Sequence, residues 1–315
     1  MPAKEPQSAP AILMIRPIRF SANPQTAASN AFQKLAGDGA AQDTQARALR
    51  EFDDLVAALR GQGVEVHVFE DTPEPHTPDS IFPNNWLTTH PDGTVVMYPM
   101  QAENRRPERR PDIVRDLVDK AGFRVSEILD LASTEADHRF LEGTGSMVLD
   151  RANRVVYACV SPRTDPELLA SWAERFGYQP IIFTAVDGGG QQIYHTNVMM
   201  CVGQHFAVVC SASIPDAAER RKVLSTLAST GHDVVEITPA QMNAFAGNML
   251  EVLGVDGGSV VAMSSRAADA LTRDQREVLE RHATIVSSDI TTIEDCAGGS
   301  VRCMMAEIFL PRVEA

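Results

Sequence analysis

Three segments of the chain place one reactive side chain where a glycine-rich stretch enters an apolar run. Cys303 follows a Gly-Gly pair, His195 follows three consecutive glycines, and Glu142 precedes a Gly-Thr-Gly sequence. Glycines permit tight turns that expose a side chain and bring backbone N–H groups near it. A thiol, an imidazole and a carboxylate can serve as the nucleophile, the proton carrier and the orienting group of a hydrolase. These residues are the first candidates for catalysis.

Each candidate also has a structural interpretation when it is taken alone. Most cysteines outside disulfides are small buried residues, and a lone histidine at a strand end is more often structural than catalytic. Cys159, Cys201 and Cys210 lie in apolar runs and are interpreted in this way, whereas Cys296 is left open. Arg302 and a nearby base would favour the thiolate form of its neighbour Cys303.

A fourth polar segment reads Pro-Asp-Ser-Ile-Phe-Pro-Asn-Asn-Trp and leads into another strand-like run. It contains Asp79, Asn84 and Asn85, and the family resemblance described below makes all three candidates for substrate binding. On its own the segment favours an Asx-turn or a strand-start cap. The loop Gln101–Pro111, rich in Arg and Pro, is predicted to be a solvated connection or an active-site lid.

Short strand-like runs alternate with helical patterns in which apolar residues recur every three or four positions. The predicted helices are Asp43–Gly61, Arg110–Gly122, Asp165–Gly177, Pro215–Gly231 and Thr272–Ala283. The predicted strands are Ala11–Pro17, Val64–Phe69, Thr94–Tyr98, Ser146–Leu149, Val155–Val160, Ile181–Thr184, Asn197–Val202, Phe206–Cys210, Val234–Ile237, Ser259–Met263 and Val301–Ile308.

Small or amide residues recur just before the strand-like runs, with separations of 60, 52, 51 and 52 residues: Asn85, Gly145, Asn197, Asn248 and Ser300. A period near fifty with one strand–helix unit per period indicates a repeat architecture. Five units suggest a ring, because closure protects sheet edges. The alternative is an ordinary α/β sandwich with coincident spacings. In a ring, Cys303, His195 and Glu142 would converge on the axis from different units.

Composition and motif content exclude several functional classes. The formal net charge of −14 and the pI of about 5.0 disfavour nucleic acid and anionic membranes as partners. The sequence lacks zinc-ligand, phosphate-loop and dinucleotide-binding patterns, so we expect no metal and no organic cofactor. It contains no signal peptide, no 18-residue apolar run and no C-x-x-C pair, which predicts a cytoplasmic protein without structural disulfides.

No linker or charge run divides the chain. Residues 1–10 are predicted to be a flexible N-terminus, and residues 11–315 a single catalytic α/β domain. The expected partner is a small amino-acid substrate, and a homodimer is left open.

Read in order, these segments resemble the guanidine-modifying superfamily of arginine deiminases, dimethylarginine hydrolases and amidinotransferases. The resemblance rests on Leu-Glu-Gly-Thr-Gly, His-Thr-Asn, Gly-Gly-Ser-Val-Arg-Cys-Met and the Phe-Pro-Asn-Asn-Trp segment, and it runs from Ile12 to Pro311. The N-terminal Met-Ile-Arg-Pro-Ile-Arg-Phe is most similar to the citrulline utilisation hydrolase, or arginine deiminase-related, branch. The family fold is a pseudo-five-fold α/β propeller of ββαβ-like repeats, the pentein fold.

The resemblance implies a covalent mechanism. Cys303 would attack the planar carbon of the substrate, His195 would carry the protons, and Glu142 would hold substrate N–H groups in line. Asp79 would bind the polar end of the substrate. Three further residues are candidates for holding the amino-acid end: Arg16, Asn23 and Arg302.

The family pattern differs here in a way that bears on the substrate. Arginine deiminases carry carboxylates where this chain has Asn85 and Asn197, and dimethylarginine hydrolases have an acid pair where Asn84 and Asn85 stand. Because carboxylates pair with a guanidinium, amides favour a neutral ureido group. The sequence therefore predicts hydrolysis of citrulline to ornithine, carbon dioxide and ammonia. The alternatives are an arginine deiminase-like or dimethylargininase-like hydrolase, an amidinotransferase, and a non-catalytic binding module of the same fold.

Overall fold

The computed structural model describes residues 5–27, 30, 32–33 and 41–313. Within these ranges the strands form five three-stranded sheets, and the sheets remain separate from one another. The sheets are β15 (Ala306–Ile308), β1 (Ala11–Arg16) and β2 (Glu65–Glu70); β3 (Leu87–Thr89), β4 (Thr94–Met97) and β5 (Glu127–Asp130); β6 (Val148–Asp150), β7 (Val155–Cys159) and β8 (Gln179–Phe183); β9 (Met200–Val202), β10 (Phe206–Val209) and β11 (Asp233–Glu236); and β12 (Leu250–Leu253), β13 (Ser259–Ser264) and β14 (Thr284–Ser288).

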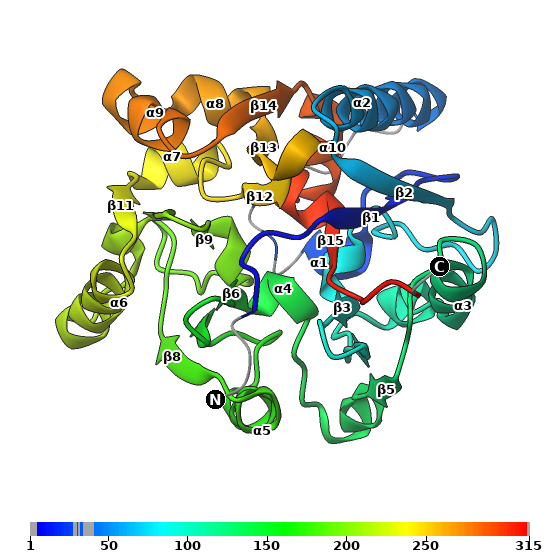
Figure 1. Ribbon diagram of the computed structural model, residues 1–315, viewed down its shortest axis with the longest axis horizontal. Coiled ribbons are helices and arrows are strands. Elements are labelled where there is room, and N and C mark those ends of the chain that lie inside the picture. Colours follow the sequence, from blue (N-terminus) through cyan, green and yellow to red (C-terminus); the bar gives the residue numbers. More distant parts are fainter. Residues whose placement is uncertain (1–4, 28–29, 31, 34–40, 314–315) are drawn as a thin grey trace.

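Every sheet has the same connectivity. Its middle strand pairs antiparallel with one neighbour and parallel with the other. A parallel pair needs a crossover, which a helix supplies in each unit. The main crossover helices are α2 (Ala41–Gly61), α3 (Pro111–Asp119), α5 (Pro166–Phe176), α6 (Ala217–Ser229) and α9 (Arg273–Glu280). Figure 1 shows these helices at the periphery and the sheets distributed around the centre.

The remaining helices are short. They are α1 (Pro24–Ala27), α4 (Gly143–Ser146), α7 (Pro239–Asn243), α8 (Ser265–Ala270) and α10 (Thr291–Ala297), with 3-10 turns η1 (Pro83–Asn85), η2 (Glu103–Glu108), η3 (Ala132–Asp137), η4 (Thr196–Val198), η5 (Ser211–Ser213), η6 (Val255–Gly257) and η7 (Val301–Met304). The turns η1, α4, η4 and η7 each lie directly before the strand of their unit that is nearest the centre.

One sheet joins the two ends of the chain. Strand β15, near the C-terminus, pairs antiparallel with β1, with Ala11 opposite Ile308, and β1 pairs parallel with β2. The inner strands also contact one another between sheets, β15 with β3, β6 with β9, and β9 with β12. The chain therefore begins and ends in the same sheet, which the pattern of repeats did not indicate.

Helix α5 illustrates how the sequence sets its elements. Asp165 caps the helix by accepting a hydrogen bond from the Leu168 N–H, and Gly177 ends it in the left-handed conformation with φ of 69°. Between these signals the apolar stripe that includes Trp172 and Phe176 is buried. Four of the five predicted helices contain the observed ones, and the fifth, Asp43–Gly61, begins two residues after the start of α2.

The strand predictions were less accurate where a polar turn precedes a strand. Val301–Ile308 was predicted to be one strand, but 301–304 form η7, in which the Cys303 N–H donates to the Ser300 carbonyl at 2.9 Å. Strands β3, β5, β12 and β14 were missed, since they are short or lack a clear alternation. The repeat position assigned to Ser300 was also wrong: Cys303 lies three residues before β15, as Asn197 lies three before β9. The predicted α/β class is confirmed.

The N-terminal segment is packed from residue 5 onward, in contrast to the flexible N-terminus predicted for 1–10. The Gln7 side chain is buried and donates to the carbonyls of Leu149 and Val202 at 2.9 and 3.0 Å, which fastens the segment across two sheets. Residues 1–4 lie outside the described part of the chain. No helix among the described residues has the length and apolar character needed to span a membrane.

Candidate active site

The turns before the inner strands gather at one place. Helix α4 contacts η1 and η4, and η1 contacts η7. Each of these four turns places a polar or small residue two or three positions before its strand, and the loop before β12 does the same: the residues are Asn85, Gly145, Asn197, Cys303 and Asn248. Asn85 and Cys303 line one pocket, the side chains of Asn197 and Asn248 contact the Cys303 sulfur, and Gly145 lies against Asn85 and His195.

This pocket has about 270 Å³ of space between its lining atoms, part of which is open to solvent. Its lining consists mainly of polar side chains: Thr26, Asn30, Asp79, Phe82, Asn85, Arg105, Arg163, Tyr194, His195, Ala297, Gly299 and Cys303. Four residues singled out in the sequence line it, namely Cys303, His195, Asp79 and Asn85. No three His, Cys, Asp or Glu side chains within the described ranges are grouped as metal ligands.

The Cys303 sulfur lies among amides. Cys303 is 4% exposed, and the side-chain nitrogens of Asn248 and Asn197 lie 3.2 and 3.4 Å from its sulfur. An amide N–H can only donate, so both contacts use the sulfur as an acceptor. This environment suits a sulfur that carries negative charge.

His195 forms a buried pair with Glu142, whose Oε2 lies 2.8 Å from His195 Nε2. Burial alone would raise the pKa of Glu142, but the charge of Arg163, the His195 hydrogen bond and Arg105 lower it to about 2. Burial lowers the pKa of His195 to about 4, against the opposing effect of Glu142. At neutral pH the pair is thus a carboxylate accepting from a neutral imidazole, which puts the proton on Nε2 and leaves Nδ1 as the basic nitrogen.

A glycine permits the His195 ring to occupy this position. A side-chain carbon at Gly145 would lie 2.8 Å from His195 Nδ1 and 2.5 Å from the side-chain nitrogen of Asn85. Both contacts are too short for a real side chain, so α4 can approach the ring only without one.

Glu142 lies behind His195 and does not line the pocket. Its Oε1 accepts the Gln101 N–H at 3.0 Å, and its Oε2 lies 3.6 and 3.8 Å from the guanidinium nitrogens of Arg163 and Arg105. Both carboxylate oxygens therefore have protein partners. This arrangement agrees with an orienting role toward His195, and the predicted contact of Glu142 with substrate N–H groups stays a prediction.

Asp79 presents one oxygen without a hydrogen-bond partner among the described residues. Its Oδ2 accepts from the Asn23 and Thr26 side chains at 2.7 and 3.4 Å and lies 3.6 Å from Arg105 Nε, whereas Oδ1 is buried and unpaired. Asn23, predicted to bind the amino-acid end of the substrate, instead supports Asp79.

Arg105 is the centre of a buried polar network. Its guanidinium donates to Glu108 at 2.9 Å and to Asn85 Oδ1 at 2.9 Å. Burial raises the pKa of Glu108 to about 8, although Arg105 opposes the shift. Because Asn85 Oδ1 accepts from Arg105, the amide orientation is fixed, and its Nδ2 remains a buried donor without a partner in the described structure.

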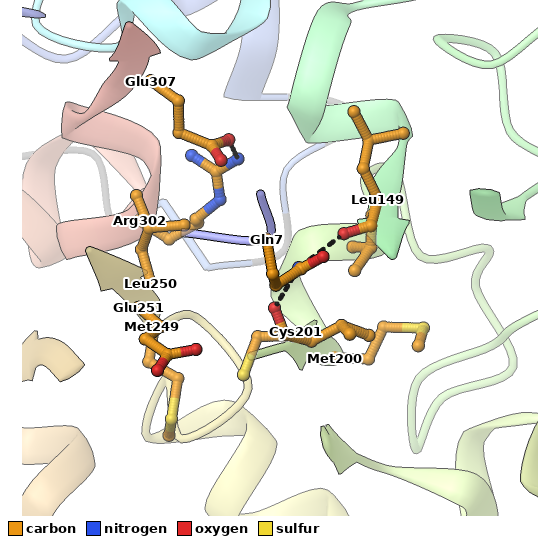
Figure 2. Close-up of a pocket in the computed structure, with 11 residues that line it drawn as sticks. Gln7, Leu149, Met200, Cys201, Met249, Leu250, Glu251, Arg302 and Glu307 are labelled. Carbon is orange, nitrogen blue, oxygen red and sulfur yellow. Dashed lines mark hydrogen bonds and ion pairs between the residues drawn. The ribbon is translucent and has the colours of Figure 1, made fainter. Parts of the chain in front are cut away.

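Two arginines proposed from sequence lie elsewhere. Figure 2 shows the Arg302 guanidinium beside the Glu307 carboxylate in a second pocket, where the two groups are 2.8 Å apart. Arg16 donates to Asp53 on α2 at 2.8 Å and lies 3.6 Å from Glu70. Neither lines the pocket that contains Cys303, so the structure does not bring these two predicted substrate-binding residues to it. Asn84 is fully buried outside the lining, and its side-chain atoms lack hydrogen-bond partners within the described ranges.

The sequence interpretation missed Arg105, Arg163, Tyr194 and Asn248 as site residues. The predicted lid Gln101–Pro111 contains η2, which carries Arg105 into the pocket. The sequence did contain a signal for Arg105. Arg105 and Glu108 are three residues apart, so they share one face of a 3-10 turn and can pair. Asn248 was recognised only as a marker of the repeat.

Several solved structures share this fold. ArgZ, titled an arginine dihydrolase from the ornithine-ammonia cycle in cyanobacteria, superposes in its apo form with a TM-score of 0.73 and 16% identity over 96% of this chain and 41% of its own. The N-terminal domain of ArgZ, as a cysteine-to-serine variant bound to substrate, gives 0.70 and 18% over 96% and 99%. A histidine-to-glycine variant of dimethylarginine dimethylaminohydrolase, an adduct with S-methyl-L-thiocitrulline, gives 0.64 and 13% over 95% and 100%.

The chain thus spans 41% of the apo ArgZ chain and nearly all of its N-terminal domain. No curated protein matches it in sequence. The model of one family, described as N,N dimethylarginine dimethylhydrolase, eukaryotic, matches residues 16–310. That match confirms the resemblance to the guanidine-modifying superfamily, and the chain belongs to the N,N-dimethylarginine dimethylhydrolase family.

Proposed function

We propose that the chain is a Cys303-dependent hydrolase of the ureido group of citrulline, which it converts to ornithine, carbon dioxide and ammonia. The single observation that carries this substrate choice is the fixed amide of Asn85. Its Oδ1 is engaged by Arg105, so the pocket receives an N–H donor. A ureido oxygen accepts such a bond, whereas a guanidinium has only donors to offer.

The acceptors of the pocket agree with the same ligand. Asp79 Oδ1 and Asn197 Oδ1 are buried without hydrogen-bond partners in the described structure, and Asn197 lies beside the Cys303 sulfur. A ureido group carries N–H donors beside its oxygen, so one donor and two acceptors complement it.

The charges around the pocket also favour a neutral reacting group. Arg105 lies 3.6 Å from Asp79 and 3.8 Å from Glu142, and Arg163 lies 3.6 Å from Glu142, so two buried guanidinium groups already stand at the pocket. A guanidinium substrate would place a third cation in this buried site, and its desolvation is costly, whereas a ureido group adds no charge.

The proposed reaction uses two proton transfers through His195. Nδ1 takes the proton of the Cys303 thiol as the sulfur bonds to the ureido carbon, and then gives it to the departing nitrogen, which leaves as ammonia. The remaining thiocarbamate is attacked by water, whose proton passes to Nδ1. The S–C bond breaks, the sulfur regains the proton, and the released N-carboxyornithine loses carbon dioxide to give ornithine.

The fold assigned to this function is a five-bladed propeller in which each three-stranded sheet is one blade. Contacts between inner strands and the shared sheet at the chain ends support it. We propose that residues 11–315 form one catalytic domain, since the pocket is lined from four of the five units and Asn248 of the fifth unit contacts Cys303. The cytoplasmic location stays a prediction from the sequence.

Arginine dihydrolysis is the second candidate. The N-terminal domain of ArgZ, titled an arginine dihydrolase, aligns with 96% of this chain, and the unpaired Asp79 oxygen could receive a guanidinium N–H. In that case the ureido compound would be the product of a first hydrolysis and the substrate of a second.

Product analysis separates these candidates. With citrulline as the substrate, we expect ornithine and ammonia in equal amounts, whereas arginine and N,N-dimethylarginine release no ammonia or dimethylamine. Asn85→Asp replaces the donor with an acceptor and is expected to lower kcat/KM for citrulline by roughly a hundredfold. Ornithine formation from arginine as well as citrulline would establish the dihydrolase, and release from arginine alone would contradict the proposal.

The acid limb of the pH–rate profile is expected near pH 4. His195 must be neutral to accept a proton, and burial lowers its pKa to about 4, so kcat/KM stays level from pH 7 to pH 5 and falls below that. Rates are measured with citrulline, and each sample is returned to pH 7 to confirm that activity recovers. A limb centred near the ordinary histidine value of about 6.5 would contradict the assignment of a buried, neutral His195.

A further inference from the structure

Asn248 is a buried side chain that connects three parts of the site. It lies two residues before β12 and is 1% exposed. Its Nδ2 lies 3.2 Å from the Cys303 sulfur and 2.9 Å from the Asn197 carbonyl oxygen, and its Oδ1 accepts the Arg302 backbone N–H at 3.0 Å. All the hydrogen-bonding groups of this amide are therefore engaged.

These contacts fix which end of the amide faces the sulfur. The Arg302 N–H can only donate, so the atom that meets it must be oxygen; the Asn197 carbonyl can only accept, so the atom that meets it must be nitrogen. The second hydrogen of that nitrogen is directed to Cys303. The amide of Asn197 lacks such a second constraint, because its Oδ1 has no partner in the described structure.

The backbone around Asn248 holds it at this distance. A side-chain carbon at Gly247 would lie 2.6 Å from the Val198 carbonyl oxygen, so this loop packs against η4 only because Gly247 has no side chain. On the other side, η7 is anchored by the Arg302 side chain, which donates to Glu307 at 2.8 Å and to the Met305 carbonyl at 2.9 Å. Figure 2 shows this anchor, with Arg302 beside Glu307.

We infer that Asn248 is a further catalytic residue, which donates a hydrogen bond to the Cys303 sulfur and favours its nucleophilic, negatively charged form. The inference rests on the proposed role of Cys303 as the nucleophile. A hydrogen bond to a charged group stabilises that group more than a neutral one, and sulfur is a weaker acceptor than oxygen, so we expect an effect of about tenfold on the reactivity of Cys303.

Alkylation of Cys303 by iodoacetamide tests this inference without any substrate. The rate is measured on the full-length chain by peptide mass analysis, with Cys303→Ala giving the background from the other cysteines. At pH 7 we expect Asn248→Asp, which keeps the acceptor for Arg302 but removes the donor, to react about tenfold more slowly than the wild type. At pH 10.5 thiols ionise without a hydrogen-bond donor, so the wild type and Asn248→Asp should be alkylated at equal rates. A variant whose site is merely distorted would still differ from the wild type at this pH.

Two controls keep the result interpretable. Asn248→Ala deletes the donor without adding an oxygen, and it is also expected to slow the alkylation of Cys303. This variant takes the place of Asn248→Asp in the test if Asn248→Asp does not fold. Asn243→Asp makes the same chemical change on an exposed residue of α7 and should leave the rate within twofold of the wild type.

The outcome is independent of the substrate assignment. Slow alkylation of the Asn248 variants supports the inference even if citrulline is not turned over, in which case only the proposed function fails. Folded Asn248 variants that alkylate at the wild-type rate at pH 7 would overturn the inference, even if citrulline hydrolysis depends on Cys303.

Discussion

Replacing Cys303 by alanine is expected to lower the rate of ornithine release from citrulline by roughly four orders of magnitude or more. Cys303 is the only cysteine that lines the pocket among the residues described. Burial raises the pKa of Cys159 to about 11 and that of Cys201 to about 12, so neither thiol is a replacement nucleophile. Ornithine is quantified by chromatography at saturating citrulline.

Cys296→Ala is the matched control, because it removes another buried thiol from α10 without touching the lining of the pocket. We expect it to retain the wild-type rate within about threefold. Thermal unfolding of both variants checks that each remains folded. A folded Cys303→Ala protein that hydrolyses citrulline at a rate near that of Cys296→Ala would refute the nucleophile assignment.

Replacing Arg105 by methionine is expected to lower the free energy of unfolding by about 3–5 kcal/mol. The guanidinium is 2% exposed and interacts with three carboxylates, Glu108, Asp79 and Glu142. Removal of the cation takes away the compensating charge beside Glu108 and Asp79, whereas Glu142 keeps Arg163 as a neighbour, and Asn85 loses the bond that fixes its amide. Urea unfolding at pH 7 measures the loss.

Arg106→Met provides the comparison from the same turn. Arg106 is about one-third exposed and pairs with Glu135 at 3.2 Å, so its loss should cost less than about 1 kcal/mol. Equal destabilisation by the two substitutions would show that the buried network around Arg105 does not have the strength assigned to it.

The sequence located the central residues of the site because their signals are local. His195 and Cys303 follow glycine-rich turns that enter apolar runs, and Asn197 marks an equivalent place in its unit. The spacing of these segments, near fifty residues, then indicated that they lie close together in the folded chain. The shared connectivity of the five sheets agrees with that spacing.

Side-chain direction within the turns was not predictable from composition. Consecutive residues of a 3-10 turn point about 120° apart, so a Cys303 side chain that faces the pocket directs its neighbour Arg302 away from it. The same rule separates buried Arg105 from Arg106, which is about one-third exposed, in η2. Adjacent arginines of one loop thus have opposite environments, and the sequence alone assigns them the same chemistry.

The pairing of β1 with β15 could also not be predicted from the sequence. These strands lie at opposite ends of the chain, and nothing in either local pattern specifies its partner. The continuous apolar run of Ala11–Arg16 identifies a buried strand, but the sheet that this strand joins depends on contacts between residues far apart in the sequence.

The most direct measurement of the central claim is the mass of the protein during turnover of citrulline. Wild type and Cys303→Ala are mixed with citrulline, quenched in acid within the first turnover and analysed as intact proteins and as peptides. The account predicts a thiocarbamate adduct on the peptide that contains Cys303, absent from the alanine variant. Ornithine release by the wild type with no adduct at any time, together with undiminished release by Cys303→Ala, would contradict it.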